Sequence, residues 1–198
     1  MKNLFTTENA AMLLIDHQVG TAKLARNIDA AHLLANVRAL ARTAVAANMP
    51  LVLTTSQEDH FQGPLYDDLA ELAPDAHAAR VKRPGVVDAW TYEPFKSAVE
   101  ATGRKKLIMA GLTNDVCTVY PSISALEDGF EVQVVVDGGG SPTQAADDIS
   151  VERMRSAGVT ITSTNQVMAE LATDWASPTG QAIQGVMYEE ILKPLVEG

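Results

Sequence analysis

Short apolar runs alternate along the chain with longer segments in which apolar residues recur every three or four positions. The short runs are rich in β-branched residues and are apolar on both faces, which is typical of strands in a parallel sheet that helices cover on each side. Five strands are predicted on this basis, at residues 11–15, 51–55, 107–110, 132–136 and 159–162.

The segments between these runs predict helices. From 29 to 48 and from 114 to 129 the apolar residues follow helical spacing, and a further helix is expected before Gly158. Thr164 is interpreted as the N-cap of a helix over 166–173. Since strands and helices alternate, the sequence predicts an α/β fold with one doubly wound, mostly parallel sheet and helices on both faces, in a Rossmann-like three-layer arrangement.

Two regions depart from this alternation. Residues 57–90 are less regular, and a long irregular insertion in a compact domain is more often functional than idle. We expect the whole chain, 1–198, to form a single domain with 177–198 as a helical tail. Apolar residues of that tail form one stripe, which would cover either the core or a neighbouring subunit; they are Ile183, Met187, Ile191 and Leu195.

The charge balance excludes several classes of protein. The chain has 15 Lys and Arg against 25 Asp and Glu, a net charge of −10, so it repels phosphate and we expect no nucleic-acid partner. No apolar run approaches the roughly 20 residues of a membrane-spanning helix, and we expect no membrane association. The residues after Met1 do not resemble a signal peptide, and a single cysteine excludes an intramolecular disulfide, so a cytoplasmic location is expected.

The residues that directly follow the strands are the first candidates for chemistry, because ligands of an open parallel sheet bind at the carboxyl ends of its strands. Asp16 ends the first strand, where it could act as a base or only accept backbone N–H groups in a turn. Cys117 follows the strand at 107–110 and is expected in the first turn of the next helix. The positive end of that helix would lower the pKa of the thiol from about 8.5 and favour a nucleophilic thiolate. The alternative is an inert core cysteine.

A carboxylate base with a cation nearby is another way to activate a thiol. None of the four histidines is well placed for a Cys–His pair. Lys82 and Arg83 are the cationic candidates, and alternation along a short strand would put them on opposite faces, so only one should face the site. A solvated basic patch is the alternative interpretation.

Three features, in this order, resemble the isochorismatase-like cysteine hydrolases. They are Asp16 at the end of the first strand, a cation about two-thirds of the way to the cysteine, and Cys117 after Gly-Leu-Thr-Asn-Asp-Val. The similarity spans about 11–165 and is carried by residues 13–18, 108–117, 124–130 and 134–137. Within the family, the segment Arg-Pro-Gly-Val-Val-Asp-Ala-Trp at 83–90 most resembles the YcaC-type branch.

The resemblance implies a catalytic triad. Cys117 would be the nucleophile and Asp16 the base that takes its proton. The third member of the family's triad is a cation, commonly lysine. Here Arg83 is favoured for that place because the YcaC-type branch has the arginine of Arg-Pro-Gly there, and Lys82 is the alternative.

The resemblance also implies an oxyanion and substrate-binding region. A cis peptide between Leu112 and Thr113 would direct the N–H groups of Thr113 and Cys117 at the developing oxyanion. Gln18 and Trp90 are expected in the same region.

Metal binding separates the branches of this family. Nicotinamidase-like members bind a metal through an Asp-x-His arrangement with a further histidine. The corresponding segment here, 57–63, offers Glu58, Asp59 and His60 without a second histidine nearby. We therefore expect no metal, and the resemblance implies no other cofactor.

Three functions remain open. The leading hypothesis is a cysteine hydrolase that cleaves a small amide or related non-peptide C–N bond through a covalent thioester. The second is hydrolysis of a vinyl ether, as in isochorismate, in which the aspartate does acid chemistry and no thiolate is required. The third is a catalytically silent α/β scaffold that binds partners.

The expected partners are a small-molecule substrate and further copies of the chain. The resemblance suggests closed rings, with an octamer of two tetrameric rings as the assembly, and closed symmetry is the rule for homo-oligomers. Aromatic residues are enriched at interface cores, so Trp175, Trp90 and Phe61 are candidates for contact between subunits.

Overall fold

The computed structural model describes residues 4–197. Its centre is a sheet of six parallel strands in the order β3-β2-β1-β4-β5-β6. The strands are β1 (Ala10–Ile15), β2 (Leu51–Ser56), β3 (Val81–Arg83), β4 (Lys106–Gly111), β5 (Glu131–Val135) and β6 (Thr160–Thr162).

Alternate residues of the central strands face two separate hydrophobic cores. In β1, Met12 and Leu14 join one core, whereas Leu13 and Ile15 join the other. All six residues of β1 are buried. A strand covered on both faces has no solvent side, which explains why this strand is a continuous apolar run.

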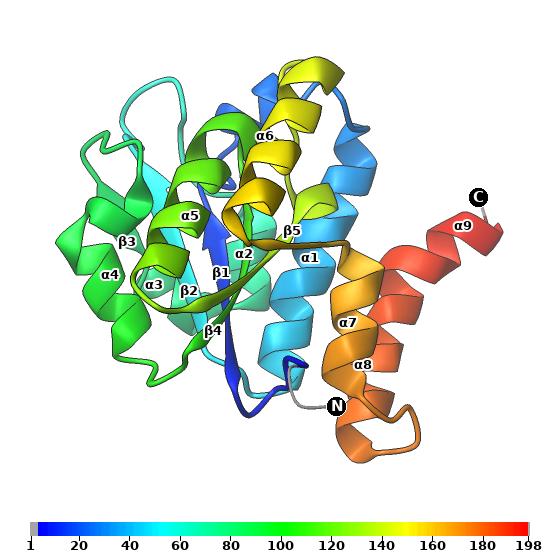
Figure 1. The fold of residues 1–198 in the computed structure, drawn as a ribbon. Coiled ribbons are helices and arrows are strands. Elements are labelled where there is room, and N and C mark those ends of the chain that lie inside the picture. Colours follow the sequence, from blue (N-terminus) through cyan, green and yellow to red (C-terminus); the bar gives the residue numbers. More distant parts are fainter. Residues whose placement is uncertain (1–3, 198) are drawn as a thin grey trace.

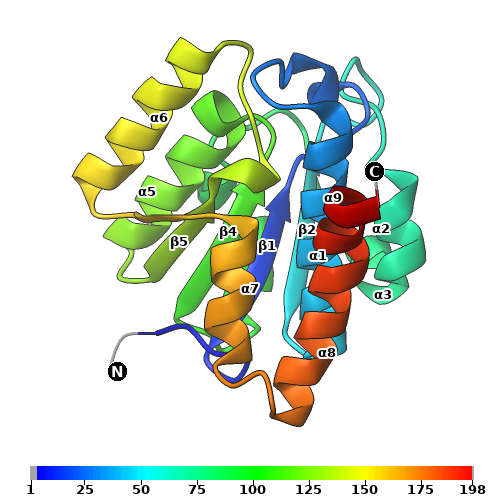
Figure 2. The same cartoon turned by 90° about the vertical axis from the view of Figure 1, so that its right-hand side faces the viewer.

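Helices cover both faces of the sheet (Figures 1 and 2). Helices α1, α7 and α8 contribute to the core of Met12 and Leu14, and α4, α5 and α6 to that of Leu13 and Ile15. Their bounds are α1 (Ala30–Ala46), α2 (Asp67–Leu72), α3 (Pro74–Ala78), α4 (Glu93–Glu100), α5 (Val119–Glu127), α6 (Gln144–Ala157), α7 (Thr164–Ala172), α8 (Pro178–Met187) and α9 (Lys193–Glu197).

The predicted doubly wound α/β fold is confirmed, with local differences. The irregular insertion contains two short helices, α2 and α3, before the edge strand β3. The N-cap of α7 is Ser163, whose hydroxyl accepts from the N–H of Gln166, so the assignment of Thr164 to that place is wrong. Thr164 is the first helical residue instead, because its N–H and hydroxyl both donate to the carboxylate of Asp137.

The C-terminal helices pack along α1 and α7 (Figure 2). Ile183 is fully buried in the core, and Met187 and Ile191 are partly buried against it. Of the two alternatives for the predicted stripe, these three residues therefore favour the first, in which it covers the core of its own subunit. Only its last member, Leu195, is exposed, at 66%. No helix between residues 4 and 197 combines the length and apolarity needed to cross a bilayer.

Candidate active site

The carboxyl ends of β1 and β4 meet at the centre of the sheet. Strand order reverses between them, since β2 and β3 extend from one side and β5 and β6 from the other. In open α/β sheets such a switch point leaves a crevice in which ligands bind. Asp16 directly follows β1 and Cys117 lies six residues after the last residue of β4, so the topology brings both candidates to this edge.

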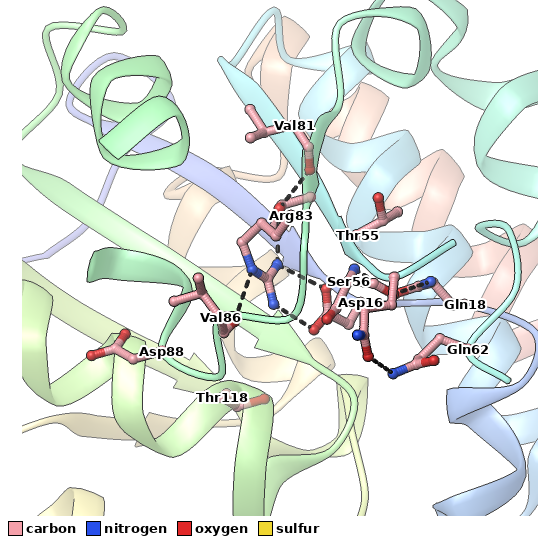
Figure 3. Close-up of polar contacts among 12 residues, drawn as sticks. Asp16, Gln18, Thr55, Ser56, Gln62, Val81, Arg83, Val86, Asp88 and Thr118 are labelled. Atoms are coloured by element: carbon pink, nitrogen blue, oxygen red, sulfur yellow. Dashed lines mark hydrogen bonds and ion pairs between the residues drawn. The ribbon is translucent and has the colours of Figure 1, made fainter. Parts of the chain in front are cut away.

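Arg83, the last residue of β3, binds Asp16 through two parallel hydrogen bonds (Figure 3). Nη1 donates to Oδ1 at 2.9 Å and Nη2 to Oδ2 at 2.8 Å, and the two side chains are 0% and 1% exposed. Nη1 also donates to the hydroxyl of Thr54 at 2.9 Å, and Nε to the carbonyl of Val86 at 3.4 Å. Because the planar guanidinium is held on several sides, the geometry of this buried pair is tightly defined.

Cys117 lies in a single π-helical turn, Asn114–Thr118, between β4 and α5. The turn is closed by Thr118, whose N–H and hydroxyl donate to the carbonyl of Thr113 at 3.1 and 3.2 Å. The peptide between Leu112 and Thr113 is cis, which the resemblance implied. The backbone of Thr113 acts on the cysteine in the direction of a lower pKa.

The thiol of Cys117 lies beside the carboxylate of Asp16, near enough for each group to shift the pKa of the other. Burial raises the pKa of the Cys117 thiol, and the negative charge of Asp16 raises it further. The prediction that the helix end lowers this pKa is therefore wrong for the resting site. Burial also raises the pKa of Asp16, against the opposing hydrogen bond and charge of Arg83. The resting site thus holds a protonated thiol beside the group that can accept its proton.

The side chain of Lys82 faces away from the Asp16–Arg83 ion pair. Its ammonium lies 2.7 Å from Oε2 of Glu58, and its side chain is 61% exposed. Arg80 binds the same carboxylate at 2.7 Å. Although burial alone would raise the pKa of Glu58, hydrogen bonds from Arg80 and Lys82 hold that pKa at about 2. Of the two cations that the sequence leaves open, the structure brings only Arg83 to Asp16.

Gln18 is fully buried and hydrogen-bonded to the main chain on both sides of its amide (Figure 3). Its Nε2 donates to the carbonyls of Ser56 and Gly63, and its Oε1 accepts from the N–H of Ser56 at 2.9 Å. Both amide protons are therefore used within the protein. The amide therefore links the segment after β1 to the loop after β2, and the expected substrate contact stays a prediction.

Trp90 and the Leu112 side chain belong to the hydrophobic cores. The indole of Trp90 is 3% exposed, packs edge-on against Phe130 with 5.0 Å between ring centroids, and donates Nε1 to Asp128 at 2.7 Å. A contact between subunits through Trp90 is therefore wrong, because its own subunit covers it. Thr113 is 4% exposed and lies beside Cys117 in the same loop.

The segment considered for metal binding lies at the surface beside Arg83. Glu58, Asp59 and His60 line a hollow of about 400 Å³ together with Lys82 and Tyr92. Between residues 4 and 197, no group of three His, Cys, Asp or Glu side chains is arranged to hold a metal ion. The carboxylate of Glu58 is occupied by Arg80 and Lys82.

Comparison with known proteins agrees with this architecture. The Isochorismatase domain family matches residues 10–166. The chain belongs to the isochorismatase family. It is 40% identical to the probable hydrolase YcaC of Escherichia coli over 167 residues, 84% of this chain and 79% of that protein.

Solved structures of the YcaC type cover almost the entire chain. YcaC from Pseudomonas aeruginosa, with hexane-2,5-diol and covalent acrylamide, is 36% identical with a TM-score of 0.92, covering 100% of this chain and 97% of that one. The E. coli YcaC crystal structure, described as an octameric hydrolase of unknown specificity, is 36% identical with a TM-score of 0.91, covering 98% and 93%. The resemblance read from the sequence is therefore confirmed at the level of family and branch.

Sequence reasoning missed two supports of the ion pair. Thr54 accepts from Arg83 and donates to the carbonyl of Val81 at 2.7 Å, so it ties the guanidinium to the sheet. The change from apolar to polar residues within β2, which begins at Thr54, is the signal that could have found it. The carbonyl of Val86 had no such signal, because any residue supplies a backbone acceptor.

Proposed function

We propose that the chain is a cysteine hydrolase that cleaves a small amide or related C–N bond through a covalent thioester on Cys117. The observation that carries this proposal is the buried Asp16–Arg83 ion pair beside the thiol of the only cysteine in the chain. A nucleophile in contact with a base, with the base oriented by a third group, is the arrangement that covalent catalysis requires.

In the proposed first half-reaction, Asp16 takes the thiol proton while the sulfur of Cys117 attacks the substrate carbonyl carbon. The carbonyl electrons move to oxygen, and the N–H groups of Thr113 and Cys117 stabilise the oxyanion. The tetrahedral intermediate collapses as its C–N bond breaks, and Asp16 returns the proton to the leaving nitrogen. The products are a free amine and a thioester.

In the second half-reaction a water molecule replaces the amine. Asp16 takes a proton from the water as its oxygen attacks the thioester carbonyl, and the C–S bond then breaks. The proton returns to the sulfur, which restores the thiol and releases the acid. Arg83 keeps its charge throughout because a guanidinium does not deprotonate in this pH range, so its role is to orient Asp16.

Two relatives support this proposal. The YcaC structure from P. aeruginosa contains covalent acrylamide, and bonding of that reagent is a reaction of nucleophilic side chains. E. coli YcaC is described as a hydrolase of unknown specificity. This chain is 36 to 40% identical to these proteins over most of its length. This similarity supports the same general chemistry for it.

Vinyl ether hydrolysis is the second candidate, and one observation favours it. Burial raises the pKa of Asp16, so a larger fraction of the carboxyl groups carries the proton that a general acid must deliver to an enol ether carbon. In that reaction the sulfur of Cys117 forms no bond to the substrate. The two candidates therefore differ in whether an acyl group becomes attached to Cys117.

A panel of small amides and one vinyl ether, assayed together, tests the proposal. We expect amide turnover in the wild type, and an acyl adduct on Cys117 in acid-quenched samples examined by mass spectrometry. Asp16→Asn is expected to lower amide turnover by about 100-fold or more, since it removes the base. Vinyl ether turnover that survives Cys117→Ala would favour the second candidate. No turnover of either class, together with no acyl adduct on Cys117, would favour a silent scaffold.

We further propose that the chain forms a closed homo-oligomer, as E. coli YcaC is described as octameric. Four apolar side chains near the C-terminus are exposed on the single subunit, and α9 extends beyond the body of the domain (Figure 1). Burial of such a patch against another copy is the usual fate of contiguous exposed apolar surface. These residues are Tyr188, Leu192, Leu195 and Val196, with exposures of 45%, 37%, 66% and 73%.

A further inference from the structure

A second buried polar network holds the start of the turn that contains Cys117. The side-chain amide of Asn114 donates to Oδ1 of Asp147 and to the carbonyl of Val136, both at 3.0 Å. The hydroxyl of Ser141 donates to the same Oδ1 at 2.7 Å. Asn114 and Ser141 are completely buried, and Asp147 is 9% exposed. The network thus joins α6 and the end of β5 to the loop after β4.

Neighbouring backbone leaves Asn114 little freedom. Both partners of its Nδ2 are acceptors, which defines the orientation of the amide. Its own N–H donates to the carbonyl of Gly140 at 2.8 Å. Gly139 passes so close that a Cβ there would lie 2.3 Å from Oδ1 of Asn114. Asn114 is therefore fixed by its side chain, by its backbone and by close packing.

Cys117 lies three residues farther along the same turn. At the far end of the turn, Thr118 bonds to the carbonyl of Thr113 through both its N–H and its hydroxyl. The sulfur is therefore carried by a short segment that is fixed at both ends. Asn114, at one of these ends, is held by Asp147 of α6. A displacement of Asn114 would move the sulfur relative to Asp16, which belongs to a different strand.

We infer that Asp147 is a positioning residue for Cys117 that acts through Asn114. Asp147 holds the amide of Asn114, Asn114 holds the start of the turn, and the turn holds the sulfur beside Asp16. The predicted effect on turnover rests on the proposed function. The predicted effect on the thiol does not, because it concerns only where the sulfur lies.

Alkylation of the thiol measures this position directly, since Cys117 is the only cysteine. In Asp147→Ala the turn should relax, and the sulfur should move away from Asp16 and toward solvent. Both changes ease formation of the thiolate. We therefore expect iodoacetamide to react several-fold faster at neutral pH, with the midpoint of the pH profile moved to lower pH. Amide turnover should fall by about 10- to 100-fold, as expected when a reacting atom is misplaced by about 1 Å.

Two further variants complete the measurement. Asp148→Ala removes the same charge from an exposed neighbour on α6 and should leave both readouts at their wild-type values. Asn114→Ala removes the other partner of the Asn114–Asp147 hydrogen bond. It should shift the rate and pH profile of alkylation in the same direction as Asp147→Ala. Because the two residues act in series, the double variant should change no more than the larger single change.

Several outcomes decide the inference. A folded Asp147→Ala protein with the wild-type alkylation profile would overturn it, as would additive effects in the double variant. If Asp147→Ala does not fold, Asn114→Ala is compared alone with the wild type, and an unchanged profile overturns the inference. If the wild type hydrolyses no amide but the alkylation profile shifts as expected, the positioning role stands and the proposed function fails.

Discussion

Arg83 and Asp16 are 67 residues apart in sequence and share two hydrogen bonds, of 2.9 and 2.8 Å, between side chains that solvent does not reach. The arginine comes from β3, a three-residue strand at the edge of the sheet. Pairing with β2 in the register Ser56–Arg83 sets its position along the sheet. The geometry of the central carboxylate therefore depends on a short edge strand.

Replacement of the two adjacent cations should have very different effects. Arg83→Ala leaves a buried, unpaired carboxylate at Asp16, and we expect a loss of about 3–5 kcal/mol in unfolding free energy and severe loss of turnover. Lys82→Ala removes a side chain that is 61% exposed and should change stability by about 0.5 kcal/mol or less. Urea unfolding and amide turnover of both variants check this, and equal effects would contradict the role of Arg83.

Cys117→Ser and Cys117→Ala should abolish amide hydrolysis and keep the fold. Each change alters the side-chain volume only slightly, so thermal unfolding should stay close to that of the wild type. Circular dichroism and turnover measured on the same samples provide the check. Near-wild-type turnover in either variant would remove Cys117 from its proposed role.

His17 should make stability depend on pH. Burial lowers its pKa to about 4, against a hydrogen bond between Nε2 and the carbonyl of Gly138 at 2.8 Å. A histidine with a depressed folded-state pKa contributes full stability above its unfolded pKa of about 6.5, and that contribution is lost as pH falls toward 4. The loss should reach about 3 kcal/mol, from about 1.4 kcal/mol for each pKa unit.

Comparison of two glutamine variants isolates this effect. His17→Gln keeps a donor for the Gly138 carbonyl and should flatten the pH dependence of unfolding free energy between pH 6.5 and 4. His32 is exposed on α1, so His32→Gln serves as the matched control and should keep the wild-type slope. If both variants show the wild-type slope, the assignment to His17 fails.

Two glycines should respond to alanine in opposite directions. At Gly139 a Cβ would lie 2.4 Å from the carbonyl oxygen of Gly111, and overpacking of this kind costs about 1–3 kcal/mol. At Gly185, in α8, an added Cβ meets no atom within 4 Å. Gly185→Ala should stabilise by about 0.5–1 kcal/mol through its helix propensity. Melting temperatures that move in the same direction for both variants would contradict this account.

The exposed C-terminal residues provide a test of assembly. Leu195→Glu places a charge at a position that is 66% exposed and should reduce the oligomer to smaller species in light scattering. Ile149→Glu, at a 70% exposed position on α6, is the control and should leave the mass unchanged. A wild-type mass near 21.1 kDa would refute the oligomer itself.

The fold was predictable because the central strands β1 and β4 are buried on both faces, so that strands and helices differ in their periodicity. Asp16 and Cys117 were both expected just after strands, and alternation along a short strand separated Arg83 from Lys82. The direction of the thiol pKa was not predictable. Local sequence showed the start of a helix near Cys117, whereas burial and the charge of Asp16, both tertiary effects, dominate there.

The main-chain partners of Gln18 were not predictable either, for a similar reason. A buried glutamine near a site looks the same in sequence whether it binds substrate or backbone. Only the positions of Ser56 and Gly63, brought close by folding, show that its amide is occupied. The same limit applies to Trp90, whose partner Asp128 lies 38 residues away.

The partners of Gln18 have a consequence for engineering. All three of its hydrogen bonds end on main-chain atoms of Ser56 and Gly63, at the two ends of the segment 57–62. Main-chain atoms are present whatever side chains the segment carries. The loop can therefore be given new side chains, including those that line the hollow beside Arg83, while its anchor to β1 stays in place. The lining of that hollow can thus be varied separately from the Asp16–Arg83 pair, and a library randomised over 57–62 is the place to begin.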